Sequence, residues 1–241
     1  MWELGRIVFL GTIAGVLGTA AGGLLLTLIG KPKDTLLCFL LAFSAGIMLA
    51  IIFQDLVLEA LDLGGLTATL VGISLGVVAL FLTTTYIGAD RLPASGLIKA
   101  GLFLGIGIAL HNLPEGLAIG AGYLSSQKLG FSLALALCLH NIPEGMAMAA
   151  PLLAGGCSPT STVLLTILAG TPMGIGSLIG ATIGTLSPQG LGGTLAFAAG
   201  AMLFLVFHEL LPQAQQESFQ VASTFGSILG ILIGLTFLVI L

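Results

Sequence analysis

The sequence predicts an all-α polytopic membrane protein with eight transmembrane helices. Hydrophobic residues make up 57% of the 241 positions and charged residues only 7%, whereas a soluble domain carries about 25% charged residues. Eight apolar runs fill the chain, and each reaches the ~20 residues that a helix needs to cross the hydrocarbon core. Because no soluble segment remains, we expect residues 1–241 to form one transmembrane domain. The predicted spans are 5–29, 34–60, 64–87, 97–124, 128–154, 160–185, 189–214 and 219–241.

The basic residues predict the orientation of these spans. With the N-terminus outside, four of the six basic residues fall in inward loops and two lie outside. This distribution favours both termini outside under the positive-inside rule. We therefore expect a multi-pass protein of the cell (inner) membrane, with the lipid bilayer as a partner. The net charge of −4 gives no indication of a nucleic-acid partner. The inward residues are Lys31, Lys33, Arg91 and Lys99, and the outward ones are Arg6 and Lys128.

Two segments of the chain repeat one another. "LAFSAGIMLAIIFQDLVLEA" at 41–60 and "LAFAAGAMLFLVFHELLPQA" at 195–214 are identical at ten of twenty positions. They belong to the second and seventh predicted helices, which cross the membrane in opposite directions. Such an inverted repeat is a common plan of secondary transporters. We therefore expect a 3+2+3 arrangement, in which helices 1–3 repeat as helices 6–8 around a central pair.

The central pair carries two copies of one polar motif. "HNLPEG" stands at 111–116 and "HNIPEG" at 140–145, each inside an apolar run. On a helix, the His and Glu of a motif lie one turn apart on the same face, with the Asn beside them. The candidate ligands are therefore His111, Asn112, Glu115, His140, Asn141 and Glu144.

These residue types suit a divalent metal ion. Two facing motifs offer imidazoles, amides and carboxylates near the bilayer midplane, a set that suits Zn²⁺, Fe²⁺ or Mn²⁺ better than Cu(I). Pro114 and Pro143 each remove an intrahelical hydrogen bond, and freed carbonyls at broken helices are typical of transporter ion sites. A structural His–Glu pair beside a proline kink is the alternative for one motif. Two copies favour function, because ionisable groups buried in a membrane are costly.

The doubled motif, the eight spans and the outward N-terminus resemble the ZIP (Zrt/Irt-like protein) family of divalent metal transporters, most of all its short prokaryotic members. The resemblance implies elevator-type movement of helices 1, 4, 5 and 6 against the other four. It also implies two sets of ligands. The first site takes His111, Glu115, His140 and Glu144, and a second takes Asn112 and Asn141 with the same glutamates. Two-metal members usually add a Glu before a Pro in helix 6, where this chain has Thr171.

Further polar residues are candidates for the transport pathway. Asp55, Glu59 and Asp62 would lie toward the outside, and His208 and Glu209 toward the inside. Carboxylates at both mouths would attract cations and pass them on. Ordinary solvated polarity at a helix end is the alternative for Glu59 and Asp62.

We therefore expect a transporter that carries divalent transition metals, Zn foremost and also Fe, Mn or Cd, toward the cytoplasm by alternating access. The metal is the substrate, and no cofactor is expected. An intramembrane metalloenzyme is the alternative, but it would use HExxH or paired ExxH motifs, whereas this chain has HxxxE. A passive metal channel is a further alternative. Glycines at four-residue spacing favour close helix packing within the chain over a homodimer seam. They are Gly11 and Gly15; Gly176, Gly180 and Gly184; and Gly226, Gly230 and Gly234.

Overall fold

The computed structural model describes residues 2–30, 33–86, 96–185, 187–215 and 219–240, and within these ranges all regular structure is helical. Six helical segments are long and apolar enough to cross a membrane. The chain is therefore a multi-pass membrane protein, as predicted. The side chains of Trp2, His111, Glu209, Gln213 and residues 237–240 lie outside the description.

The helices follow the predicted spans closely. A π-helical turn (η1, η3) follows both α2 and α8. The elements are α1 (Trp2–Ile29), α2 (Asp34–Ile51), η1 (Ile52–Leu56), α3 (Val57–Tyr86), α4 (Gly96–Ser125), α5 (Gln127–Ala154), α6 (Pro159–Gly170), α7 (Pro172–Gly184), α8 (Pro188–Leu205), η3 (Val206–Leu210), α9 (Leu211–Ala214) and α10 (Gln220–Ile240).

Helix α3 bends sharply at Gly65. Its φ of 71° and ψ of 173° interrupt the helix, and a positive φ of this kind is readily adopted only by glycine. The first part of α3 continues α2 and η1, and the part after Gly65 runs back along α8. The predicted boundary between 34–60 and 64–87 lies within a few residues of this bend.

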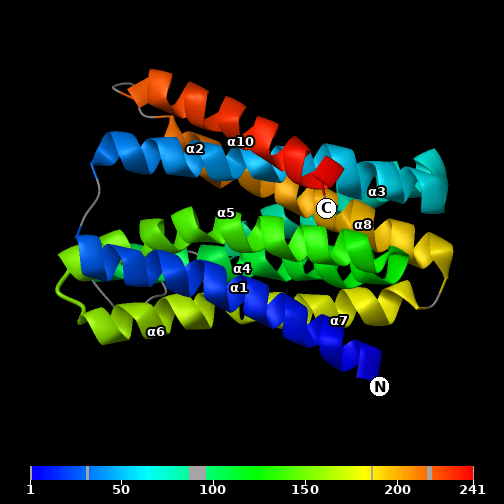
Figure 1. Cartoon of the computed structure of the whole chain (residues 1–241), viewed down its shortest axis with the longest axis horizontal. Coiled ribbons are helices and arrows are strands. Elements are labelled where there is room, and N and C mark those ends of the chain that lie inside the picture. The colour runs from blue at the N-terminus through cyan, green and yellow to red at the C-terminus, as the bar shows by residue number, and fades with distance from the viewer. Residues whose placement is uncertain (1, 31–32, 87–95, 186, 216–218, 241) are drawn as a thin grey trace.

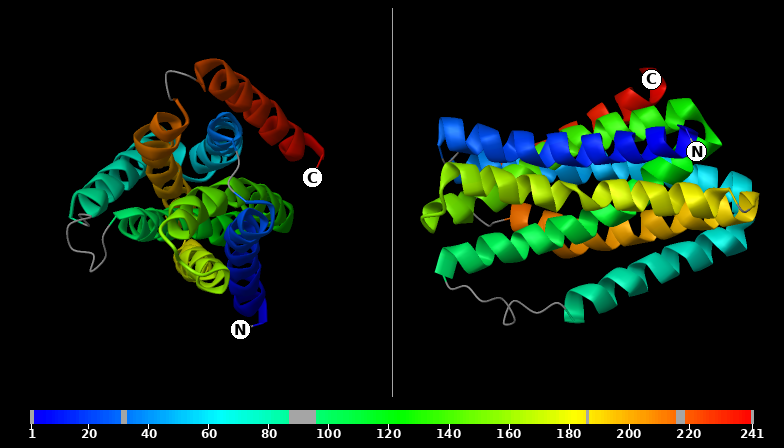
Figure 2. Two further views of the ribbon diagram at one scale, coloured as in Figure 1. Left: turned by 90° about the vertical axis from the view of Figure 1, so that its left-hand side faces the viewer. Right: turned by 90° about the horizontal axis from the view of Figure 1, so that it is seen from below.

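The helices form two bodies that lie side by side (Figures 1 and 2). The motif body contains α1, α4, α5, α6 and α7, in which α4 packs on α7 and both α1 and α4 pack on α5. The companion body contains α2, α3, α8 and α10, in which α3 packs on α8 and α10 packs on α2. The bodies meet where α8 contacts α4 and where α2 contacts α5.

The two π-helical turns occupy matching positions of the repeated segments. Turn η1 begins at Ile52 and η3 at Val206, and the 154 positions between them equal the offset of the repeat. The sequence did not indicate either turn. A π-turn adds a residue to one helical turn without breaking the helix, so the apolar pattern continues through it.

Glycines allow the closest helix approaches, again in matching pairs. A Cβ added to Gly76 would lie 2.1 Å from the carbonyl oxygen of Phe197, and one added to Gly230 would lie 2.1 Å from that of Phe43. Both the glycines and the phenylalanines are 154 positions apart. These contacts place glycine faces of α3 and α10 against helices of the same chain, as the sequence indicates.

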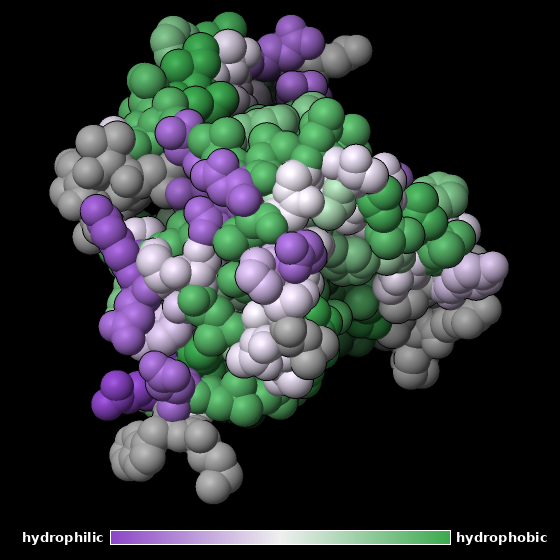
Figure 3. Space-filling model, turned by 90° about the vertical axis from the view of Figure 1, so that its right-hand side faces the viewer, coloured by the Kyte–Doolittle hydropathy of each residue, from purple (hydrophilic) through white to green (hydrophobic). Residues whose placement is uncertain are grey.

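The ends of the bundle differ in their basic residues. Helix α1 begins and α10 ends toward the same end of the bundle (Figure 1), together with Arg6 and Lys128. Lys33 and Lys99 lie at the opposite end, where α2 and α4 begin. Figure 3 looks onto the end with the termini, where hydrophilic residues gather over part of an otherwise largely apolar face. The predicted inward residues Lys31 and Arg91 lie outside the described residues.

Candidate metal centre

The two motifs lie on antiparallel neighbours, near the middle of α4 and α5 (Figure 1). Both helices continue through their motif prolines, Pro114 and Pro143. The helices are therefore not broken there, in contrast to the expectation from proline alone. Neighbouring turns of the same helix and packing of the motif body hold the chain helical despite the lost hydrogen bonds. As a result, the motif residues keep regular helical spacing.

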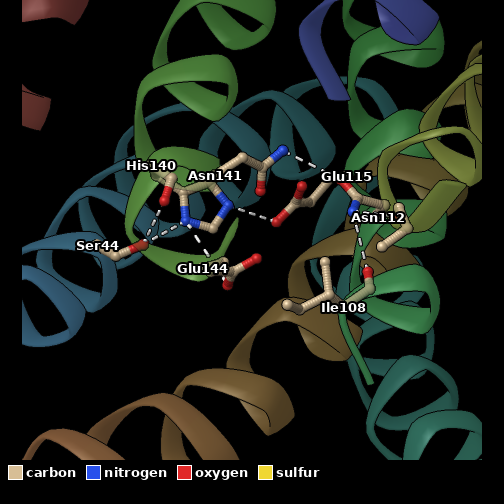
Figure 4. A network of polar contacts seen from close by, with 8 residues as sticks. Ser44, Ile108, Asn112, Glu115, His140, Asn141 and Glu144 are labelled. Carbon is tan, nitrogen blue, oxygen red and sulfur yellow. Dashed lines mark hydrogen bonds and ion pairs between the residues drawn. The ribbon is translucent and has the colours of Figure 1, made fainter. Parts of the chain in front are cut away.

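His140 is at the centre of the polar cluster (Figure 4). Its Nε2 atom lies 2.7 Å from Oε1 of Glu115 on α4, and its Nδ1 atom lies 3.9 Å from Oε1 of Glu144 one turn along α5. The side chains of His140 and Glu115 are fully buried, and that of Glu144 is 2% exposed. Three ionisable groups thus meet inside the membrane-spanning part of the molecule, where each is expensive to bury without a partner.

The two motif asparagines tie three helices together. Asn141 donates a hydrogen bond to Oδ1 of Asn112 over 3.1 Å, which joins α5 to α4. Asn112 in turn donates to the carbonyl oxygens of Ile108 (3.0 Å) and Ala169 (2.9 Å), and the second of these lies on α6. Both side-chain N–H groups of Asn112 are therefore occupied, and its carbonyl oxygen faces the cluster.

A serine on the companion body completes the cluster. The Oγ atom of Ser44, on α2, lies 2.6 Å from Nδ1 of His140 and donates to the carbonyl oxygen of His140 over 2.9 Å (Figure 4). Ser44 is not among the residues predicted from the sequence to belong to the site. A signal was present, because the repeat pairs Ser44 with Ala198, which makes Ser44 a polar substitution within an apolar helix.

The cluster combines nitrogen and oxygen donors in apolar surroundings. Among the described residues, Oε2 of Glu115 and Oδ1 of Asn141 are buried without a hydrogen-bond partner. Within the same part of the chain, no three His, Cys, Asp or Glu side chains already stand at metal-ligand spacing. A bound cation would therefore replace the contact between Glu115 and His140. Imidazole and carboxylate donors together suit a borderline divalent metal such as Zn²⁺.

Comparison with known proteins identifies the family. The sequence model of the ZIP Zinc transporter family matches residues 83–241, which include both motifs. Zinc transporter ZupT of Salmonella paratyphi A is 34% identical over 230 residues, which cover 88% of this chain and 84% of that protein. The chain belongs to the ZIP family. Zinc transporter ZTP29 of Arabidopsis thaliana is 33% identical over 228 residues, which cover 84% of this chain and 83% of that protein.

A third relative matches over a shorter region. Zinc transporter GufA of Myxococcus xanthus is 37% identical over 138 residues, which cover 57% of this chain and 54% of that protein, so the match spans about half of that relative. Membership of the ZIP family confirms the predicted resemblance. It identifies the chain as a metal transporter and removes the alternative of an intramembrane metalloenzyme.

Of the six candidate ligands in this ZIP protein, the structure brings five together and leaves one undescribed. Glu115, His140 and Glu144 form the ionisable centre, and Asn112 and Asn141 lie beside it. His111 lies on α4 at the position equivalent to His140, but its side chain is outside the described residues.

Thr171 does not reach the cluster in this ZIP protein. It is an exposed residue between α6 and α7, and its hydroxyl donates to the carbonyl oxygen of Leu168. Pro172 starts α7 at this point, but Thr171 keeps helical dihedral angles, and Pro159–Gly184 forms one candidate span, close to the predicted span 160–185. The contribution of α6 to the cluster is the backbone carbonyl of Ala169. Such a backbone contact depends on helix packing and carries no sequence signal.

The pathway candidates on the first repeat lie toward the end with the termini. Asp55 is partly buried in η1, and its Oδ2 atom has no hydrogen-bond partner among the described residues. Glu59 is partly buried and accepts a hydrogen bond from Ser125, the last residue of α4. Asp62 is exposed. Glu59 therefore has a defined contact across the two bodies.

The pathway candidates on the second repeat lie toward the opposite end. His208 is exposed in η3, and its ring stacks on Phe204 with centroids 4.7 Å apart. The side chain of Glu209 is outside the described residues. The structure therefore separates Asp55 and His208 along the bundle and brings neither to the metal centre.

Proposed function

We propose that this ZIP protein carries divalent transition-metal ions, zinc foremost and also iron, manganese or cadmium, across the inner membrane toward the cytoplasm. The single observation that carries the proposal is the buried contact of His140 with Glu115 and Glu144 at the middle of two membrane-spanning helices. Ionisable groups in such a place are rare and mark ion pathways. The proposed ligands are His111, Asn112, Glu115, His140, Asn141 and Glu144.

Charge balance supports a dication as the substrate. Glu115 and Glu144 carry two negative charges inside the membrane-spanning part of the molecule, and His140 contacts both. Burying charges without compensation costs several kcal/mol for each ion. One divalent ion would neutralise both carboxylates and use the nitrogen of His140 as a further ligand.

We infer eight spans in a 3+2+3 arrangement. The stretch from Asp34 to Tyr86 has 53 residues, which at ~1.5 Å a residue would reach ~80 Å, more than twice the ~30 Å of the hydrocarbon core. The bend at Gly65 lets it cross twice. Adding α10 to the other spans gives eight, of which α4 and α5 form the central pair.

The packing of helices supports an inverted repeat. If α1, α2 and α3 are exchanged with α6–α7, α8 and α10, the contact of α3 with α8 becomes that of α10 with α2. If α4 is exchanged with α5 as well, the contact of α4 with α7 becomes that of α5 with α1, and both members of each pair occur. The matching π-turns and the matching glycine contacts are also related by this exchange of the two repeats.

One cavity lies between the two bodies, and another, of about 480 Å³, lies within the motif body between α1 and α5, toward the end with the termini. The first cavity, of about 380 Å³, lies between α2, α4 and α5 on the side of the end with Lys33. It extends to Leu41 and Ala147, each three residues from a member of the cluster, Ser44 or Glu144. Its lining is Asp34, Leu37, Cys38, Leu41, Leu97, Leu104, Ala147, Ala150, Pro151 and Ala154.

The repeat-equivalent positions at the other end belong to the apolar core. Leu191 and Leu195 correspond to Leu37 and Leu41 of the cavity, and they are 7% and 0% exposed. Leu133, Ala118 and Ala121 correspond to Leu104, Ala147 and Ala150, and all are fully buried. The same repeat positions are thus packed in one half and line a cavity in the other. This difference supports alternating access, with the state seen here open toward the end that has the cavity.

The basic residues support a cytoplasmic location for the end with the cavity. Lys33 and Lys99 lie at that end, and Arg6 and Lys128 lie at the other. Four of the six basic residues of the sequence are predicted to face inward. Under the positive-inside rule, this favours an orientation in which the end with the cavity faces the cytoplasm and both termini lie outside. The cavity would then be the release route of an inward-open state.

The division into two bodies supports an elevator-type movement. The motif body holds both motifs, and its contacts with the companion body involve mainly α4 on α8 and α2 on α5. Movement of the motif body along this interface would carry the cluster between the two ends. A passive channel would need an open route at both ends, and the packed leucines opposite the cavity favour a carrier instead.

Uptake into proteoliposomes tests the proposal. Purified protein is reconstituted with a zinc-sensitive dye inside the vesicles, and Zn²⁺ is added outside with or without Fe²⁺, Mn²⁺ or Cd²⁺. We expect saturable uptake that each competing metal reduces, and none in vesicles without protein. Uptake that rises linearly with zinc concentration would contradict a carrier, and the absence of protein-dependent uptake would contradict metal transport.

A further inference from the structure

We infer that Ser44 is a positioning residue for the metal centre: its hydroxyl fixes the imidazole of His140 with Nδ1 as a hydrogen-bond donor, which leaves Nε2 as the nitrogen that binds the metal. This inference rests on the proposed function, because it assigns a role in the binding of the transported metal. Ser44 is fully buried on α2, in the companion body, and contacts the motif body through His140 alone among its described hydrogen bonds.

The Ser44 hydroxyl has a single proton, and this decides the role of Nδ1 in the ring of His140. The carbonyl oxygen of His140, 2.9 Å from Oγ of Ser44, can only accept a hydrogen bond, so it takes the single hydroxyl proton. The Nδ1 atom, 2.6 Å from the same Oγ, must then be the donor. Nδ1 is thereby held as a donor to the hydroxyl. The 2.7 Å contact between Nε2 and Oε1 of Glu115 also needs a hydrogen between its two atoms, and a bound metal would take the place of that hydrogen at Nε2.

This arrangement prepares Nε2 as a metal ligand. A histidine that binds a metal through one ring nitrogen commonly donates its other N–H to an oxygen, and this contact sets both tautomer and ring orientation. The hydroxyl of Ser44, which is itself bonded to the backbone carbonyl oxygen of His140, holds the ring from the side away from Glu115 (Figure 4). Loss of such a partner typically weakens metal affinity about 10- to 100-fold.

The two halves of the repeat differ at this position. Ser44 corresponds to Ala198 on α8, and His140 corresponds to His111 on α4. Ala198 is fully buried, and its methyl group cannot form a hydrogen bond. The hydroxyl therefore belongs to one half of a site whose other polar residues are repeated. Ser44 and His140 belong to different bodies. The hydrogen bonds of the Ser44 hydroxyl to His140 therefore form in the conformation described here and would break when the bodies move.

Equilibrium binding of Cd²⁺ to the purified protein tests this role. We expect Ser44→Ala to bind Cd²⁺ about 10-fold more weakly than the wild type, and Ser44→Thr, which keeps the hydroxyl, to bind within about threefold of it. Ser177→Ala is the matched control, because Ser177 is also fully buried but, among the described residues, its hydroxyl bonds to Met173 in its own helix alone. This control should bind as the wild type does.

A spectroscopic measurement separates positioning from a general loss of structure. With ¹¹³Cd and ¹⁵N-labelled histidine, the coupling shows which ring nitrogen of His140 binds the metal, and His140→Ala identifies its signal. We expect coupling through Nε2 in the wild type and a weaker or mixed signal in Ser44→Ala. Coupling through Nδ1, or unchanged affinity in Ser44→Ala, would overturn the inference and leave the proposed transport intact. A wild type that binds no Cd²⁺ would instead contradict both.

Discussion

The Nε2 atom of His140 lies 2.7 Å from Oε1 of Glu115, and both side chains are fully buried. This contact joins the two motif helices through groups that a membrane interior strongly disfavours unless they are paired. A metal ion that takes both residues as ligands must open the contact and replace it. The empty and the loaded centre therefore differ mainly in what neutralises the two glutamates.

The charge of the cluster predicts one tightly held metal in each chain. Only Glu115 and Glu144 supply negative charge to it among the described side chains, and at an effective dielectric of ~20 two divalent ions ~4 Å apart repel by about 16 kcal/mol before ligands compensate. Isothermal calorimetry should therefore give one tight zinc. Two tight ions in the wild type would contradict this charge argument.

A variant at Thr171 provides a control for the stoichiometry. Thr171 is exposed and lies between α6 and α7, away from the cluster. A new carboxylate there has no route to the metal without rearrangement of the helix. We therefore expect Thr171→Glu to keep one tight zinc in calorimetry. A second tight ion in this variant would show that α6 can turn toward the centre.

Replacement of His140 should change which metal is preferred. His140→Ala removes the central imidazole and leaves oxygen donors, which favour harder cations such as Mn²⁺ over Zn²⁺. We expect the KM for Zn²⁺ uptake to rise at least about 10-fold, with a smaller change for Mn²⁺. Uptake assays with each metal measure the ratio, and an unchanged ratio would argue that His140 is not a ligand.

The close helix approaches predict the positions at which a residue larger than glycine destabilises the fold most. A Cβ at Gly230 would lie 2.1 Å from the carbonyl oxygen of Phe43, and such overpacking typically costs about 1–3 kcal/mol. Gly230→Ala should lower the thermal unfolding midpoint in detergent. Gly193→Ala is the matched control, because no atom lies within 4 Å of its added Cβ. Equal midpoints for the two variants would contradict the close packing of α10 on α2.

Much of the helical architecture could be predicted because the apolar runs are long and nearly uninterrupted. The bend at Gly65 falls near a predicted boundary, since glycine marks places where a helix can turn. The π-turns could not be predicted, because they leave the apolar pattern intact. The interruption between α6 and α7 at Thr171 is local to Pro172, and the predicted span 160–185 continues across it.

The candidate ligands could be predicted because polar residues at helical spacing stand out in apolar runs. Their partners depend on how helices from distant parts of the chain meet. Ser44 reaches His140 only because α2 packs on α5, and the carbonyl of Ala169 reaches Asn112 only because α6 packs on α4. Such contacts between distant segments are set by packing, and a single sequence does not reveal them.

The orientation of the repeat predicts opposite accessibility of its two polar ends. Single cysteines at Asp55 and His208, in a background without Cys38, Cys138 and Cys157, should react with membrane-impermeant reagents from opposite sides. The two residues lie toward opposite ends of the bundle. Intact and inverted vesicles supply the comparison. Labelling of both cysteines from the same side would contradict the topology and the pathway.

The most direct test of the central claim is zinc uptake by Glu144→Ala in proteoliposomes. Glu144 contacts His140 and supplies one of the two carboxylates of the centre. The control Glu3→Gln removes a carboxylate from an exposed position at the start of α1. At equal amounts of reconstituted protein, Glu144→Ala should lose at least about 99% of uptake, a drop of about 2.7 kcal/mol or more in transport efficiency. The Glu3→Gln variant should retain the zinc uptake of the wild type. Near-normal uptake by Glu144→Ala would contradict the assignment of the buried cluster as the transport site.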